Sequence, residues 1–313
     1  MSDDTWAGLA DQFADEAYAS VKGYVRTYVM HQQLLEHLPP PPAPAPVLDV
    51  GGGAGHQSFP LAQLGYDVTL LDSSPAMLDK ARQRLARLPA EARRRVTLLQ
   101  GDAEHADEAV HGGRYAAVLC HGVLGYLEDP GPVVGQLCRC AAAGGVVSIM
   151  TGNAKAAAVR PAMERRWDDA LASFDARTEI GVLGVPGRAD TVEELSELVR
   201  SRGVEPQRWY GVWLFVDWLE FSGAELDPGD AEQVAATAAV ELEASRRDPY
   251  RQLSRVFHLV GRKGPALPSL GGCQAGRRVV GRPRRLGGRG DTRDTDHHPG
   301  GGGDGKALAP GDP

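Results

Sequence analysis

One glycine-rich stretch carries the clearest chemical signal in the sequence. A short apolar run, residues 47–50, leads into Asp49-Val50-Gly51-Gly52-Gly53-Ala54-Gly55, and a helix is predicted from His56. Glycines at 51, 53 and 55 allow the backbone to turn tightly and to approach a ligand closely. A dinucleotide oxidoreductase would carry G-x-G-x-x-G, which needs glycine at position 56 or 58, where this chain has His56 and Ser58. The acidic residue before the glycines instead suits a ligand with a cationic part.

Three further elements follow the next predicted strands. Asp72 ends the second strand, about twenty residues beyond the glycines, where a carboxylate can accept hydrogen bonds from both ribose hydroxyls of a nucleoside. Its alternative role is to cap the following helix, although Ser73 or Ser74 could supply that cap. The run Gly101-Asp102-Ala103-Glu104 follows the third strand, where an adenine edge would lie, unless it is only a polar turn. His121 ends the fourth strand, where it would line the ligand site or satisfy a buried hydrogen bond.

These features together predict S-adenosylmethionine as the ligand. That molecule combines an ammonium, a carboxylate, a sulfonium and an adenosine, and it has no pyrophosphate to cradle. Asp49 would face the cationic part, Gly51, Gly52 and Gly53 would leave room for the rest, and Asp72 would hold the ribose.

Strands and helices alternate around these residues. The sequence predicts strands over 47–50, 67–72, 95–100, 115–120 and 145–150, with helices over 56–64, 74–88 and 130–140. Strands that alternate with helices in this way imply an α/β fold with a parallel sheet and helices on both faces. Farther along, we expect helices over 154–175, 191–202 and 230–246 and strands over 207–218 and 254–262. Thr191 and Glu194 have the spacing of a capping box.

Composition divides the chain into three parts. Residues 1–46 read as an N-terminal helical segment to Leu38, followed by a stiff Pro-rich linker over 39–46. Residues 47–263 form the predicted catalytic domain. Residues 264–313 are rich in glycine and proline and lack aromatic side chains, so we expect a disordered tail.

Charge and cysteine content exclude several classes of protein. The net charge is −7, and the tail is basic, so the remainder is still more acidic and does not carry the electrostatic footprint of a protein that grips phosphates broadly. No apolar run reaches the roughly 18 residues of a membrane span. The first eleven residues hold three aspartates and no Lys or Arg, unlike a signal peptide. Four cysteines without metal-site spacing favour reduced thiols. We therefore expect a cytoplasmic protein with no metal and no membrane partner.

In their order and spacing, these elements resemble the class I S-adenosylmethionine-dependent methyltransferase superfamily from Val47 to about Arg262. The resemblance implies a Rossmann-like seven-stranded methyltransferase sheet with helices on both faces. A narrower resemblance is to the bacterial tRNA 5-carboxymethoxyuridine methyltransferases. The segments that carry it are Tyr18–Arg26, Val47–Ala81, His121–Pro130, Asp248–Tyr250 and Arg255–Lys263.

This narrower resemblance implies cofactor contacts for residues that the spacing alone leaves open. The residues that match the family's cofactor-binding positions are Arg26, Gly51, Gly52, Asp72, Ala103, Glu104 and His121. Without the resemblance, Arg26 reads as a solvated charge on a helix. With it, the guanidinium is expected near the methionine carboxylate of the cofactor.

The chain departs from this family in two places. The segment Ile180–Arg188 has one basic residue where the family tends to have a Lys-rich stretch, and Trp213 stands where an arginine facing the substrate is expected.

Three hypotheses therefore stay open. The first is a tRNA-esterifying methyltransferase, the second is a methyltransferase of a small metabolite, and the third is a catalytically silent protein that binds the cofactor. An acceptor carboxylate would need no general base, because it is ionised at pH 7. This fits a sequence without a convincing acid/base pair, in which His31, His121 and Tyr126 are weak candidates.

Overall fold

The computed structural model describes residues 10, 17–40, 45–180, 186–224 and 226–265. Most of the predicted tail, and most of residues 1–16, therefore lie outside the described residues. The division of the chain into 1–46, 47–263 and 264–313 stays a prediction.

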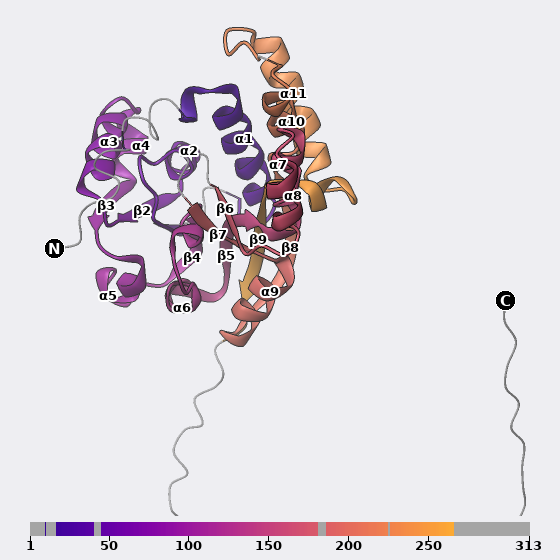
Figure 1. Cartoon of the computed structure of the whole chain (residues 1–313). Coiled ribbons are helices and arrows are strands. Elements are labelled where there is room, and N and C mark those ends of the chain that lie inside the picture. The colour runs from indigo at the N-terminus through magenta and orange to yellow at the C-terminus, as the bar shows by residue number, and fades with distance from the viewer. Residues whose placement is uncertain (1–9, 11–16, 41–44, 181–185, 225, 266–313) are drawn as a thin grey trace, which may run out of the picture. The chain divides into compact units, whose positions relative to one another are not determined.

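A nine-stranded sheet organises the described residues (Figure 1). Its strands are β1 (Pro46–Val50), β2 (Asp67–Asp72), β3 (Val96–Gln100), β4 (Tyr115–His121), β5 (Ala141–Asn153), β6 (Thr178–Ile180), β7 (Pro186–Asp190), β8 (Val204–Val212) and β9 (Val256–Lys263). Strands β3, β2, β1, β4 and β5 lie side by side and parallel. Strand β9 pairs antiparallel with β5, and β8 pairs antiparallel with β9. The path β3-β2-β1-β4-β5-β9-β8 is the Rossmann-like seven-stranded sheet that the resemblance implies.

The sheet has an additional hairpin that the sequence did not predict. Strands β6 and β7 pair antiparallel, and β7 joins the carboxyl end of β5 through Gly152 and Asn153. The short, Gly- and Pro-containing segment gave no strand signal, because its pairing depends on the neighbouring end of β5.

Helices cover both faces of the sheet, as expected from strands buried on both sides. The helices are α1 (Val21–Leu35), α2 (Ser58–Leu64), α3 (Pro75–Ala86), α4 (Ala90–Arg94), α5 (Ala106–Ala109), α6 (Gly131–Cys140), α7 (Val159–Met163), α8 (Trp167–Ser173), α9 (Val192–Ser201), α10 (Phe215–Phe221) and α11 (Ala231–Ala244). On one face, α5, α6 and α9 pack on the side chains that include Leu48, Val118 and Leu259. On the other face, α1 and α2 pack on the side chains that include Val47, Leu119 and Val260. Alternation along the strands therefore places Asp49, His121 and the residues in register with them on the α1 side.

Helix α1 begins at Val21, and Ser20 is its N-cap residue. The Ser20 hydroxyl accepts a hydrogen bond from the Gly23 backbone N–H (3.0 Å). Helix α1 lies beside α10 and α11 (Figure 1). This packing holds its buried Arg26 and Gln33 against the sheet.

Two of the predicted elements are wrong in part. The single helix expected over 154–175 is broken into a 3₁₀ turn, α7 and α8, since Arg165 adopts φ +59° between the two helices. The strand expected over 207–218 ends where Trp213 adopts φ +62°, and α10 follows. The buried Glu241 carboxylate accepts hydrogen bonds from the backbone N–H groups of Leu214 (3.1 Å) and Val216 (2.6 Å) and so satisfies donors at the start of α10.

The capping predictions are confirmed. Thr191 and Glu194 form a reciprocal capping box at the start of α9. The Ser74 hydroxyl caps α3 by accepting a hydrogen bond from the Met77 N–H (3.3 Å). Ser74 therefore takes the capping role that was the alternative for Asp72.

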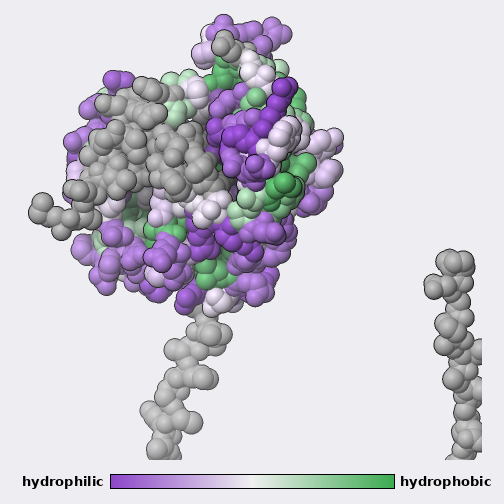
Figure 2. Space-filling view, viewed as in Figure 1, coloured by the Kyte–Doolittle hydropathy of each residue, from purple (hydrophilic) through white to green (hydrophobic). Residues whose placement is uncertain are grey.

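Figure 2 shows a mainly hydrophilic surface with smaller hydrophobic areas on the face in view. Three large apolar side chains in and just after α8 are more than half exposed: Trp167, Leu171 and Phe174. Within the described ranges, no helix has the length and apolar character needed to cross a membrane.

Candidate functional site

Two adjoining cavities lie at the carboxyl end of the parallel strands. The first has a volume of about 280 Å³ and is bounded by the loops that follow β1, β2, β3 and β4. Of the residues predicted to bind the cofactor, those that line it are Arg26, Asp49, Gly51, Gly52, Gly53, Asp72, Ala103 and His121. Glu104 is exposed and is not among the residues that line the cavity. Its backbone carbonyl accepts a hydrogen bond from Gln136 of α6.

The glycine loop needs glycine for its conformation and for clearance. Gly51 and Gly53 have φ values of +68° and +54°, which L-residues rarely adopt. A side chain at Gly51 would also collide with Val123 in the loop after β4. The Gly51 N–H donates to the Leu71 carbonyl (2.8 Å), and this bond holds the turn against β2. The loop backbone therefore forms one wall of the cavity.

Asp72 ties two of these loops together. Its Oδ2 accepts a hydrogen bond from the Gly53 N–H (2.8 Å), and its Oδ1 accepts one from the Ser74 N–H (2.9 Å). An ionised carboxylate only accepts hydrogen bonds, and these two bonds orient the group. The carboxylate is thus fixed at the cavity wall.

Asp49 is a buried carboxylate beneath the glycine loop. Among the described residues its Oδ2 has no hydrogen-bond partner. Burial raises the pKa of Asp49 to about 7 and the nearby Asp72 carboxylate also raises it, whereas the Ser58 hydroxyl and Arg26 lower it. A cation in the cavity would stabilise the ionised form of Asp49.

Arg26 reaches the site from α1, although it is only 6% exposed. Its guanidinium donates a hydrogen bond to the Tyr18 hydroxyl (2.8 Å) and lies 5.2 Å from the centre of that ring. The Tyr18 ring in turn stacks on His56 at 3.7 Å, beside the glycine loop. In the part of the chain that the structure describes, no carboxylate forms an ion pair with Arg26. A buried guanidinium with a neutral partner is suited to receive an anion.

His121 lies at the boundary between the two cavities and lines both. Its Nε2 is hydrogen-bonded to the Ser148 hydroxyl (2.8 Å), and its Nδ1 is buried with no partner among the described residues. Burial, followed by His258 and Arg26, lowers the pKa of His121 well below its ordinary range. The ring is therefore neutral at physiological pH.

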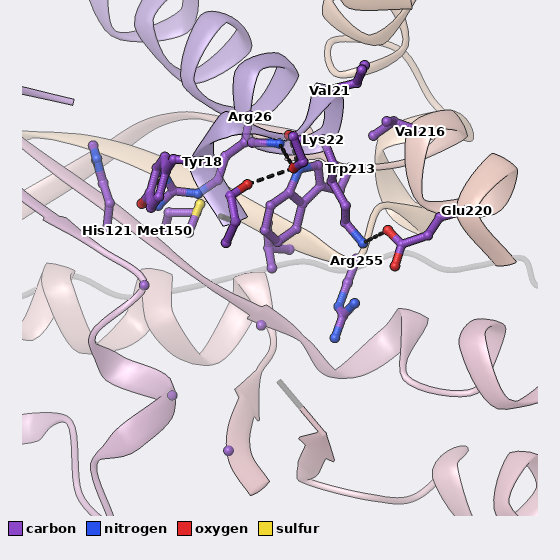
Figure 3. Close-up of a pocket in the computed structure, with 18 of the residues that line it drawn as sticks. Tyr18, Val21, Lys22, Arg26, His121, Met150, Trp213, Val216, Glu220 and Arg255 are labelled. Carbon is purple, nitrogen blue, oxygen red and sulfur yellow. Dashed lines mark hydrogen bonds and ion pairs between the residues drawn. The ribbon is translucent and has the colours of Figure 1, made fainter. Parts of the chain in front are cut away.

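The second cavity is larger, with a volume of about 690 Å³. It shares Tyr18, Arg26, His121, Gly122 and Tyr126 with the first cavity. Figure 3 shows α1 and the segment after β8 on two of its sides, with Trp213 next to Lys22. The Trp213 indole N–H donates to the Lys22 carbonyl (3.0 Å). A volume of this size accommodates a drug-sized molecule.

Charged side chains line the second cavity on several sides. Its cations are Lys22, Arg26, Arg188 and Arg255, and Glu220 is its lining carboxylate. Lys22 forms ion pairs with Glu220 (2.6 Å) and with Asp217, which also lies 3.6 Å from Arg255. Arg188 pairs with Asp190 (2.9 Å). Two other arginines, Arg160 and Arg208, do not line this cavity.

Several residues of the site had little or no signal in the sequence. Tyr18 lay in a resembling segment without an assigned role, Tyr126 was named only as a weak candidate for a general base, and Met150 looked like an ordinary residue of a strand. Ser148 and His258 carried a usable sign, since each is a polar residue inside an apolar strand that is buried on both faces. No group of three potential metal ligands occurs among the described residues.

The chain is similar in sequence or in structure to several known methyltransferases. A family model described as a methyltransferase domain matches residues 48–147. The tRNA 5-carboxymethoxyuridine methyltransferase of Escherichia coli (strain K12) is 26% identical over 268 residues, which cover 84% of this chain and 97% of that protein. Magnesium-protoporphyrin O-methyltransferase of Rhodobacter capsulatus is 35% identical over 127 residues, covering 40% of this chain and 53% of that protein. The solved structure of the CcbJ methyltransferase from Streptomyces caelestis matches with a TM-score of 0.50 and 17% identity, over 83% of this chain and 97% of that one. This last likeness concerns the fold.

Proposed function

The chain is an S-adenosylmethionine-dependent methyltransferase with a Rossmann-like fold, and we propose that it methylates a carboxylate to form a methyl ester. The observation that carries the proposal is the charge around the second cavity, where the four lining cations face three carboxylates, Glu220, Asp217 and Asp190, and one positive charge is left in excess. This local excess of positive charge occurs in a chain whose net charge is −7. It would attract an anionic acceptor that the chain as a whole repels.

The first cavity fits S-adenosylmethionine in its donor and acceptor groups. Asp49 offers an unpartnered carboxylate oxygen and His121 an unpartnered ring nitrogen, both suited to the ammonium and sulfonium end. Arg26 offers a guanidinium to the methionine carboxylate, and Asp72 offers a fixed carboxylate to the ribose hydroxyls. The backbone around Asp102 and Ala103 would border the adenine. Glu104 is left without a side-chain role in this assignment.

S-adenosylmethionine supplies an activated methyl group, which is transferred by in-line displacement from its sulfonium. In the proposed reaction, a carboxylate oxygen of the acceptor forms a bond to the methyl carbon as the carbon–sulfur bond breaks, and the bonding electron pair stays on sulfur. No proton has to be removed from the acceptor. The protein therefore acts by holding both molecules in line across the boundary at His121 and by excluding water. Met150 and Trp213 supply apolar wall for that exclusion.

A hydroxyl or amine acceptor fits this site less well. Such an acceptor would benefit from a general base near pH 7. The candidate at the boundary between the cavities is His121, whose lowered pKa makes it a weak base. Glu220 is engaged by Lys22.

For the identity of the acceptor, 5-carboxymethoxyuridine in tRNA is the first candidate, because the relative similar over 84% of this chain is named for that nucleoside. A small carboxylic acid is the second candidate. The wall of the second cavity supports it, since Trp213 and several aliphatic side chains make a largely apolar surface.

Incubation with radiolabelled S-adenosylmethionine distinguishes these candidates. The protein is supplied with bulk tRNA that carries 5-carboxymethoxyuridine in one reaction and with a small-molecule acid extract in another. If tRNA is the acceptor, label enters tRNA and the transfer weakens steeply with salt, because phosphate contacts release counterions. If a small acid is the acceptor, label enters the extract and the salt effect is mild. The absence of transfer to either fraction would contradict the proposed function.

A further inference from the structure

A chain of buried hydrogen bonds runs beneath α1 and ends at His121. His121 of β4 is joined to the Ser148 hydroxyl of β5 (2.8 Å), which is joined to Nε2 of His258 in β9 (2.7 Å). Nδ1 of His258 is joined to Oε1 of Gln33 in α1 (2.7 Å), and the Gln33 amide nitrogen donates to the Gly211 carbonyl (3.2 Å). The three side chains behind His121, those of Ser148, His258 and Gln33, are fully buried.

The fixed end of this chain sets the direction of every hydrogen bond in it. The Gly211 carbonyl can only accept, so the Gln33 nitrogen must face it and the Gln33 oxygen must face His258. His258 then carries its proton on Nδ1. Burial lowers the pKa of His258 to about 3, so the ring is neutral and its Nε2 is an acceptor. The Ser148 hydroxyl donates to that Nε2, and its oxygen accepts from His121.

His121 is thereby held with its proton on Nε2. In a neutral imidazole the other nitrogen is then an acceptor. That nitrogen, Nδ1, is the buried atom without a partner among the described residues, in a side chain that lines both cavities.

We propose that Gln33, His258 and Ser148 are positioning residues that fix the Nε2–H tautomer of His121, so that its Nδ1 lone pair receives the cofactor's ammonium. The proposal rests on the cofactor assignment made above for the first cavity. The opposite tautomer would direct an N–H group toward a cation. Gln33, His258 and Ser148 line neither cavity, so any effect they have on the cofactor passes through His121. This series of hydrogen bonds acts on the cofactor side of the site, so its role does not depend on which acceptor is methylated.

The tautomer can be measured directly in the ligand-free protein. Long-range ¹⁵N–¹H correlation spectra of the full chain, labelled on the histidine rings and assigned with a His121→Gln variant, report which nitrogen carries the proton. We expect the Nε2–H pattern for His121 and the Nδ1–H pattern for His258. An Nδ1–H pattern for His121 in the wild-type protein would overturn the proposal, whatever the outcome of the methyl-transfer assays.

Two substitutions test whether this series of hydrogen bonds sets the tautomer of His121. Gln33→Met removes the acceptor that fixes the direction, and Ser148→Ala removes the link to His121. In both variants the Nδ1–H form of His121 should gain population, and affinity for S-adenosylhomocysteine measured by calorimetry should fall about twofold as the competent tautomer falls to about half of the molecules. Tyr210→Phe is the matched control, because Tyr210 stacks on His258 at 5.7 Å but contributes no bond to the chain. Folded Gln33→Met and Ser148→Ala proteins with the wild-type tautomer and affinity would contradict the proposal.

Discussion

Replacing Asp49 with asparagine should stabilise the ligand-free protein while weakening cofactor binding. Asparagine has nearly the same shape as aspartate and carries no charge. The folded protein raises the pKa of Asp49 from 3.8 to about 7, mainly through burial. Each pKa unit corresponds to about 1.4 kcal/mol, so the ionised carboxylate destabilises the fold by about 4 kcal/mol above pH 7.

The sign of this effect depends on pH. Because the pKa is raised in the folded state, stability from this group is fully present below pH 3.8 and is lost as the pH rises toward 7. Asp49→Asn should therefore melt about 10 °C above the wild type at pH 8, and the difference should disappear near pH 4. Scanning calorimetry of the ligand-free proteins from pH 4 to pH 8 measures it.

Binding should change in the opposite direction. A cationic ligand favours the ionised form of Asp49, so wild-type affinity for S-adenosylmethionine should fall by up to about tenfold per unit as the pH drops below 7. The Asp49→Asn protein should bind weakly and without this dependence. Asp67→Asn, at the exposed start of β2, is the matched control and should change neither property. A less stable Asp49→Asn protein at pH 8, or one with wild-type affinity, would refute the reasoning.

Four further substitutions or deletions test other parts of the account. Asp72→Asn should weaken S-adenosylmethionine binding by about 1.5–3 kcal/mol in calorimetry, since a charge-assisted acceptor is lost, and unchanged affinity in a folded protein would place Asp72 outside the ribose site. Glu241→Ala should lower the free energy of unfolding by about 2–4 kcal/mol in denaturant titrations, because two buried backbone N–H groups lose their acceptor, and an effect below about 1 kcal/mol would contradict the capping role. Trp213→Ala should raise the KM for the acceptor and leave cofactor affinity unchanged, whereas a change confined to cofactor affinity would place Trp213 in the first cavity. Deleting residues 266–313 should leave the melting temperature and methyl transfer nearly unchanged, as their composition indicates, and a large drop would show that the tail packs.

The sequence was sufficient for the elements whose signals are local. Periodicity and turn residues located the five parallel strands, the glycine loop, α6, and α3 and α9 together with the caps of these two helices. The seven-strand order required the resemblance as well, because strand pairing is a non-local property. The end of β8 could not be predicted, since the helix start at Leu214 depends on a carboxylate 27 residues farther along the chain.

The site was predictable where a residue ends a strand, and less so where a contact comes from elsewhere. Asp49, Asp72 and His121 follow from their positions at the carboxyl edge of the sheet. Arg26 required the resemblance, because an arginine on an amphipathic helix looks the same whether it points to solvent or into a cavity. The hydrogen-bonded chain behind His121 joins α1 to three strands, and no spacing in the sequence encodes that meeting.

The chemical linkage of the transferred methyl group tests the central claim most directly. Protein, radiolabelled S-adenosylmethionine and the acceptor fraction that takes up label are incubated together, and the product is exposed to mild alkali. A methyl ester hydrolyses under these conditions, so the account predicts that the label is released as volatile methanol. Label that stays on the product after alkali would show an ether or N-methyl linkage and would contradict a carboxylate acceptor.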